Sequence, residues 1–95
     1  MSRMQELENI FMKAKELHQY VAVVFQIKGM TTNEIIINHP TNIDTKLAYY
    51  KKTYADNGEH KFTNEVKIVD AVRGSTFNTL EAQLKYNMIS GESNE

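Results

Sequence analysis

The spacing of apolar residues changes several times along the chain, and each stretch of regular spacing predicts one helix or strand. Between residues 4 and 18 they recur every three or four positions, which is the spacing of one face of an α-helix. This stripe comprises Met4, Leu7, Phe11, Ala14 and His18, widened by Ile10 and Leu17. We therefore expect a first helix whose apolar side packs on a sheet.

Two stretches of alternating apolar residues follow and predict a pair of strands. In residues 20–28 one side is apolar throughout and the other only at its start, which predicts a central strand partly covered on both faces. Residues 33–39 form a second strand, rich in isoleucine. Residues 29–32 between them are too few for the crossover of a parallel pair, so we expect an antiparallel hairpin.

A second helix and a third strand are expected after Pro40. Thr41 and Asp44 have the spacing of a capping box, which predicts a helix start at Thr41. Residues 56–58 form its stop signal. Its apolar stripe comprises Ile43, Leu47, Tyr50 and Tyr54. The alternation from Phe62 to Gly74 then predicts a third strand, which could pair with either of the first two.

The last segment, residues 77–88, fits two patterns. Phe77, Leu80, Leu84 and Met88 have helical spacing, but Leu84, Tyr86 and Met88 also alternate as in a strand. The good helix formers in residues 79–85 favour the helix.

The predicted order is therefore α-β-β-α-β-α, an α+β fold with a small three-stranded, mainly antiparallel sheet. We expect one domain over residues 1–89 and a flexible C-terminal tail over residues 90–95. The two edges of such a sheet are unpaired. Pairing one of them across a two-fold axis would form a homodimer.

Composition narrows the class of protein. The 95 residues are 41% hydrophobic, and 11 basic against 12 acidic residues give a net charge of -1. The absence of cysteine excludes disulfides, a thiol nucleophile and cysteine-based metal sites. No apolar run approaches the roughly 18 residues of a membrane span, and charged residues interrupt any signal peptide. We expect a cytoplasmic protein without membrane contact.

The motifs of common chemistries are missing from the sequence. The glycines are isolated, so there is no phosphate-binding loop, and there is no His-Glu-x-x-His or Gly-x-Ser-x-Gly. His18, His39 and His60 lie on three separate connections, whereas metal ligands usually come in close pairs. We predict no enzyme activity, cofactor or metal site. Asp70 and Arg73 are interpreted as structural, with a small-molecule (nucleotide-like) pocket near them as an alternative.

Residues 46–54 interleave three lysines with three tyrosines. Since Tyr50 and Tyr54 belong to the buried stripe, Tyr49 is left on the outer side of the helix. The candidate partner-binding residues are Lys46, Tyr49, Lys51, Lys52 and Arg73. Asp44 and Asp56 flank this basic segment, which weighs against nucleic-acid binding and favours an ordinary solvated helix face. Because tyrosines can anchor interfaces, we favour a protein partner, with nucleic-acid binding as the alternative.

Two segments resemble small uncharacterised accessory proteins from phages and prophages of Gram-positive bacteria. They are residues 42–50, with the sequence Asn-Ile-Asp-Thr-Lys-Leu-Ala-Tyr-Tyr, and residues 66–81, which contain Val-Arg-Gly-Ser-Thr-Phe. Similar proteins share a lysine-bearing middle helix and a strand that ends in Gly-Ser before a short helix. The resemblance implies a non-enzymatic protein that binds and blocks a host factor, and it identifies no site residues.

Overall fold

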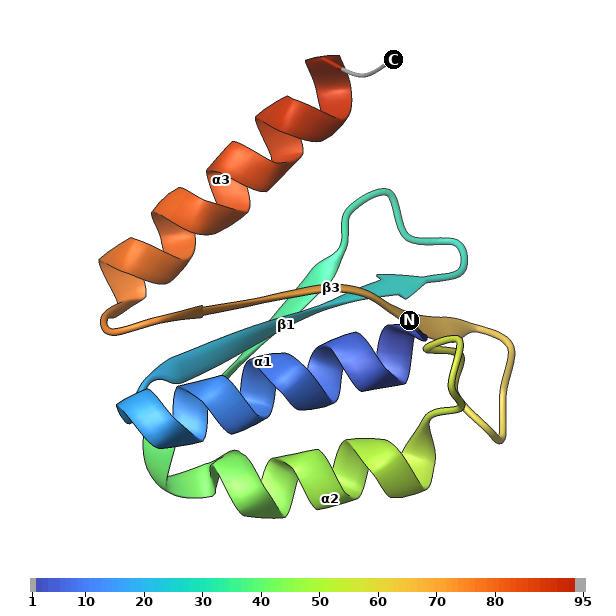
Figure 1. Ribbon diagram of the computed structural model, residues 1–95. Helices are drawn as coiled ribbons and strands as arrows, with labels where there is room; N and C mark the ends of the chain where they lie inside the picture. The colour runs from blue at the N-terminus through green and yellow to red at the C-terminus, as the bar shows by residue number, and fades with distance from the viewer. Residues whose placement is uncertain (1, 94–95) are drawn as a thin grey trace.

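The computed structural model describes residues 2–93, which form one small α+β domain (Figure 1). The order of helices and strands is α-β-β-α-β-α, as predicted. The elements are α1 (Arg3–Leu17), β1 (Tyr20–Ile27), β2 (Glu34–Asn38), a 3-10 turn (Pro40–Asn42), α2 (Ile43–Thr53), β3 (Val66–Gly74) and α3 (Phe77–Ser93).

The three strands form one antiparallel sheet in the order β2-β1-β3. The prediction of a central first strand is confirmed, and the open question is answered: β3 pairs with β1, not with β2. The register of β1 and β3 shifts where Val24 pairs with Asp70 and Phe25 with Ile68. Val69 is thus the extra residue of a bulge, which adds twist to the sheet. The outer edge of β2 has no neighbouring strand within residues 2–93.

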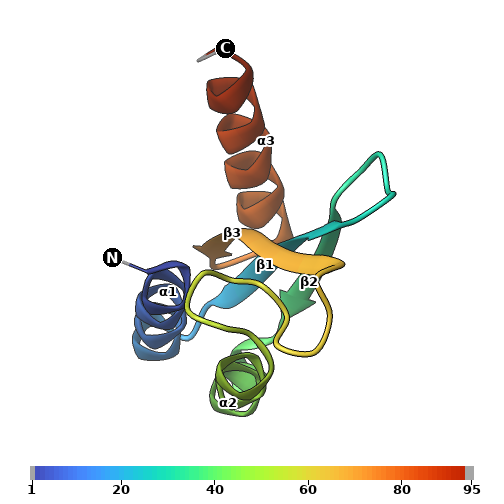
Figure 2. The same cartoon turned by 90° about the vertical axis from the view of Figure 1, so that its right-hand side faces the viewer.

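Helices α1 and α2 cover one face of the sheet (Figure 2). The main core lies between them and β1, and Leu7, Phe11 and Val23 are among its buried side chains. The predicted stripe of α1 is buried at Met4, Leu7, Phe11 and Ala14 and half-buried at Ile10, but Leu17 and His18 at its end are exposed. His18 takes a left-handed conformation, with φ of 54°, and its N–H caps the helix by donating to the carbonyls of Ala14 and Lys15.

The other face of the sheet is covered only in part. Leu80 of α3 packs against Ala22 and Val72 in a second, smaller core. Beyond this contact α3 diverges from the sheet (Figure 1). Ile35 and Ile37 of β2 therefore stay exposed.

The third strand is shorter than predicted, because it begins at Val66 and not at Phe62. Residues 54–65 form turns tied by isolated bridges between Tyr54 and His60 and between Glu59 and Lys67. Gly58 sits at the centre with φ of 90°, and its carbonyl accepts a hydrogen bond from the N–H of Ile68. This loop leaves Phe62 81% exposed, although the sequence pattern placed it on the strand.

The capping box predicted at Thr41 does not form. Instead the His39 side chain accepts a hydrogen bond from the N–H of Thr41, 3.2 Å away, and caps the 3-10 turn. Pro40 favours this arrangement because its fixed φ suits the first position of a helical turn. Helix α2 then starts at Ile43, and its N-cap Asn42 makes no side-chain hydrogen bond to the helix.

Helix α3 settles the ambiguity of the last segment and extends to Ser93. Residues 90–93, assigned to the tail from the sequence, are thus helical, and residues 94 and 95 lie outside the described part of the chain. Among residues 2–93, no helix has both the length and the apolar character required to cross a membrane.

Candidate binding site

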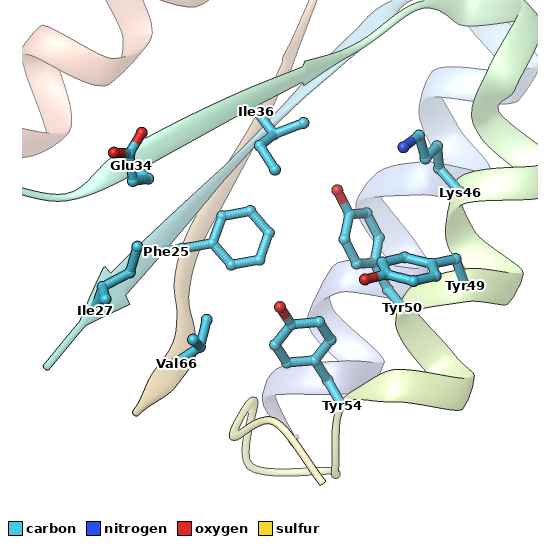
Figure 3. A pocket seen from close by; sticks show the side chains of 9 residues that line it. All are labelled: Phe25, Ile27, Glu34, Ile36, Lys46, Tyr49, Tyr50, Tyr54 and Val66. Carbon is cyan, nitrogen blue, oxygen red and sulfur yellow. The ribbon is translucent and has the colours of Figure 1, made fainter. Parts of the chain in front are cut away.

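A cleft of about 440 Å³ lies between β2 and α2 (Figure 3). Strand residues form one wall and tyrosines of the α2 region form the other. We call it the tyrosine cleft. Its lining residues are Phe25, Ile27, Glu34, Ile36, Lys46, Tyr49, Tyr50, Tyr54 and Val66.

The cleft exists because α2 packs mainly against α1 and lies apart from β2. Aromatic rings fill the inner part of the gap. The ring of Phe25 lies 6.0 Å from that of Tyr50 and 5.8 Å from that of Tyr54, measured between centroids. Tyr50 lies on α2 and Tyr54 follows the helix as its C-cap, and both rings meet Phe25 on the inward face of β1. Figure 3 shows the phenolic oxygens of both rings directed toward the strand wall.

The rim of the cleft is more exposed than its floor. Tyr49 is 51% exposed and Ile36, across from it on β2, is 46% exposed. The Tyr49 ring packs against Tyr50 with 5.4 Å between centroids, and the Lys46 ammonium lies 5.9 Å from the Tyr49 centroid. The rim therefore combines a supported aromatic ring, an aliphatic side chain and a cation.

Burial moves the pKa of both inner phenols further above neutral pH. It raises the pKa of Tyr50, an effect that the neighbouring Asn38 side chain partly offsets and that Tyr49 slightly increases. Burial also raises the pKa of Tyr54, and the neighbouring Tyr49 and Tyr50 raise it further. At neutral pH both hydroxyls are consequently protonated and can donate or accept hydrogen bonds.

Two opposite charges stand at different ends of the tyrosine cleft. The Glu34 carboxylate lies beyond Ile36 on β2, and the Lys46 ammonium lies near the start of α2 (Figure 3). Neither group belongs to any of the ion pairs formed among residues 2–93. An apolar floor with neutral hydroxyls and a charged group at each end suits the side chains of a polypeptide.

The five predicted partner-binding residues do not form one surface. Lys46 and Tyr49 meet at the tyrosine cleft. Lys51 instead pairs with Glu8 of α1, 2.8 Å between Nζ and Oε2. Lys52 is exposed but does not line the cleft, and Arg73, on β3, donates to Gln19 Oε1 at 2.9 Å.

The same ion pairs bear on the nucleic-acid alternative. Lys51 and Glu8 neutralise one another, and Lys15 of α1 pairs with Asp44 of α2 at 2.9 Å. These lysines of the helical layer are thus matched by acids, whereas a nucleic-acid surface needs a continuous basic stripe. No arrangement in the described residues favours that alternative.

Asp70 and Arg73 are not brought together into a polar pocket. Asp70 lines the α3 side of the sheet, and its Oδ1 accepts a hydrogen bond from the N–H of Ala71 at 2.8 Å. Arg73 is an odd number of positions away along β3 and so points to the opposite face. Within residues 2–93 no group of three His, Cys, Asp or Glu side chains could hold a metal ion.

The sequence did not identify the strand wall of the site. Glu34, Ile36 and Phe25 were assigned to strand faces, but which helix each would face was unknown. The alternation of side chains along the two strands was the available signal. Together with the pairing of β1 and β2, it places Phe25 and Ile36 on the same face of the sheet, the one that α2 covers.

Comparison with known proteins adds no relative: no family model, curated protein or solved structure matches this chain.

Proposed function

We propose that this protein is a non-catalytic, cytoplasmic accessory protein that acts by protein–protein contact, with the tyrosine cleft as its contact surface. The observation that carries the proposal is the exposed rim, where the Tyr49 ring and the Ile36 side chain face each other across a preformed apolar cleft.

Such a rim can contribute binding energy at little entropic cost. A tyrosine has few rotatable bonds, and Tyr49 is already held by its contact with Tyr50, so little conformational entropy is lost when a partner covers it. Tyrosine is also enriched among the residues that dominate binding energies at interfaces. A partner side chain that fills the inner part of the cleft would bury apolar area beside neutral hydroxyls, between the charges of Glu34 and Lys46 at its two ends.

The resemblance to phage and prophage accessory proteins supports a more specific role, in which the bound protein is a bacterial host factor and binding blocks it. This role needs no catalytic group in the accessory protein. Steric coverage of the host factor is sufficient, because an interface of standard size buries about 800 Å² on each partner.

The test is affinity capture from a Gram-positive bacterial lysate with identification by mass spectrometry. Tyr49→Ala removes the rim ring, and Phe62→Ala removes an equally aromatic but more exposed ring outside the cleft. We expect a protein that wild type and Phe62→Ala both retain and that Tyr49→Ala loses by about ten-fold or more. Equal retention by all three proteins, or no specifically retained protein, would contradict the proposal.

A further inference from the structure

The outer edge of β2 is a second exposed surface, and it lacks the usual protection of sheet edges. An edge strand directs the N–H and C=O groups of alternate residues away from its only neighbour. Natural edges are commonly blunted by lysine, proline or bulges. Strand β2 has no lysine, proline or bulge, and its one charged residue, Glu34, is at its first position. Its three central residues, Ile35, Ile36 and Ile37, are each between 43% and 47% exposed.

We infer that this edge binds a second copy of the chain, through antiparallel pairing of the two β2 strands about a two-fold axis at Ile36. The result is a continuous six-stranded sheet in a homodimer. The inference does not require the external partner proposed above. It does, however, bear on the tyrosine cleft, because Ile36 of the second copy would join its rim.

The pairing register follows from the pattern of β2. Centring the axis on Ile36 pairs all five residues of the strand, and shifting the centre to Ile35 or Ile37 leaves some of them unpaired. The centred register places Ile35 opposite Ile37 of the second copy, twice per dimer. The four side chains then cover one another on the sheet face that α3 leaves open. Cross-strand pairs of β-branched residues are a favourable combination in sheets.

The charges at the two ends of β2 are complementary under the same symmetry. Antiparallel pairing places Glu34 of the second copy opposite Asn38, which is the end of β2 that leads into α2. Lys46 lies near this end, on the same face of the sheet as Glu34 (Figure 3). Within one copy, Glu34 and Lys46 are at opposite ends of the cleft and form no ion pair with each other. In the dimer each Glu34 approaches the Lys46 of the other copy.

The area of this contact determines how strong a dimer we expect. Pairing of two five-residue strands buries less area than the roughly 1,200 Å² at the lower end of stable interfaces. We therefore expect a weak dimer that dissociates on dilution, with a dissociation constant on the order of 100 μM.

The experiment is sedimentation velocity of the purified protein over a dilution series from about 1 mM to about 1 μM, a range that brackets that constant. Ile36→Lys places two introduced ammonium groups opposite each other at the axis, and it should raise the dissociation constant by about ten-fold or more. Met12→Lys, on α1, is the control. Met12 is 48% exposed, close to the 46% of Ile36, and this substitution should leave dimerisation unchanged.

A charge exchange tests the register without altering the isoleucines. Glu34→Lys alone should weaken the dimer by about two- to thirty-fold, since two exposed ion pairs are lost. Adding Lys46→Glu to it should restore dimerisation, because the pair is re-formed with opposite polarity. Glu16→Lys makes the same change of net charge on α1 and should have no effect.

Each outcome of these experiments supports or contradicts the inference. Concentration-dependent dimerisation that Ile36→Lys and Glu34→Lys weaken, and that the charge exchange rescues, supports the inference. A monomer at every concentration overturns it, as does a dimer that Ile36→Lys leaves intact. A double variant no better than Glu34→Lys also overturns the proposed register. Circular dichroism establishes that each variant is folded; should Ile36→Lys not fold, the exposed charge variants decide the question.

Discussion

At the scale of single residues, Phe11 is the side chain on which the helical layer and the tyrosine cleft both depend. It is fully buried in α1, and its ring meets Tyr50 edge-to-face with 5.8 Å between centroids. Tyr50 in turn supports Tyr49 at the rim. The binding surface is thus built outward from the core, one aromatic ring on the next.

Phe11→Ala should lower the free energy of unfolding by about 3–5 kcal/mol, because it removes a large buried ring and leaves a cavity. Met12→Ala, at the adjacent and exposed position, should change it by less than about 0.5 kcal/mol. Urea unfolding followed by circular dichroism measures both. Similar effects of the two substitutions would contradict the packing described.

Tyr50 links stability to alkaline pH. Its raised pKa means that the folded protein holds the phenolic proton more tightly than the unfolded chain. Its contribution to stability is therefore complete below the unfolded value of 10.0 and is lost as pH rises through the higher folded value. Tyr54 acts in the same direction.

Tyr50→Phe should consequently lose less stability between pH 7 and strongly alkaline pH than wild type does. At neutral pH the two proteins should differ by less than about 1 kcal/mol, because Asn38 Oδ1 accepts no hydrogen bond from Tyr50 that the substitution could remove. Urea unfolding at a series of pH values tests this. Parallel losses in wild type and variant above pH 10 would show that Tyr50 is not the group responsible.

Burial was the residue property that the sequence predicted best. Where a prediction of burial was wrong, the cause is local. The stripes of α1 and α2 follow from helical spacing, which also placed Tyr49 outside and Tyr50 inside. His18 was counted in the first stripe because its position fits the period. It lies instead in the left-handed cap, where the chain reverses toward β1 and the period no longer applies.

At the scale of elements, the loop between α2 and β3 decides where β3 begins. Gly58 stands against the sheet with φ of 90°, and a Cβ there would lie 2.7 Å from the Ile68 carbonyl oxygen and 2.8 Å from Arg3 Cγ. Gly29 in the β1–β2 turn also has a positive φ, of 86°, but faces open space. The two glycines share a backbone requirement and differ in steric surroundings.

Gly58→Ala should therefore destabilise the fold more than Gly29→Ala. We expect about 1–2 kcal/mol for Gly29→Ala, from backbone strain alone, and at least about 1 kcal/mol more for Gly58→Ala, from the added collision with the β3 backbone. Thermal and urea unfolding of both variants measure the difference. Equal losses would mean that the loop does not press on β3 as described.

Element types and order could be predicted from the sequence because periodicity reports secondary structure directly. The boundaries of β3 and α2 could not. The alternation that began at Phe62 is real, but the turn at Gly58 holds those residues off the sheet. The Thr41 capping pattern competed with the His39 cap of the 3-10 turn, and Pro40 favoured the latter.

At the scale of the whole molecule, the tyrosine cleft and the β2 edge form one continuous surface, because Ile36 belongs to both. From the sequence, Lys46 and Tyr49 could be predicted as candidate binding residues, but Glu34 and Ile36 could not. The last two face Lys46 and Tyr49 only because of how α2 packs beside β2. Lys51 and Arg73 had equally suitable side chains, yet the fold engages them with Glu8 and Gln19. Residue type therefore indicated candidate contact residues, and the arrangement of helices and strands determined which of them line the cleft.

We propose that the β2 edge and the adjoining cleft are a protein-contact surface, which a second copy of the chain occupies at high concentration. Amide hydrogen exchange measured by NMR at about 10 μM and about 1 mM tests it most directly, because these concentrations span the expected dissociation constant. We expect slower exchange at the higher concentration for the outward-directed amides of β2, with unchanged rates in residues 61–65. Identical β2 rates at both concentrations would contradict it.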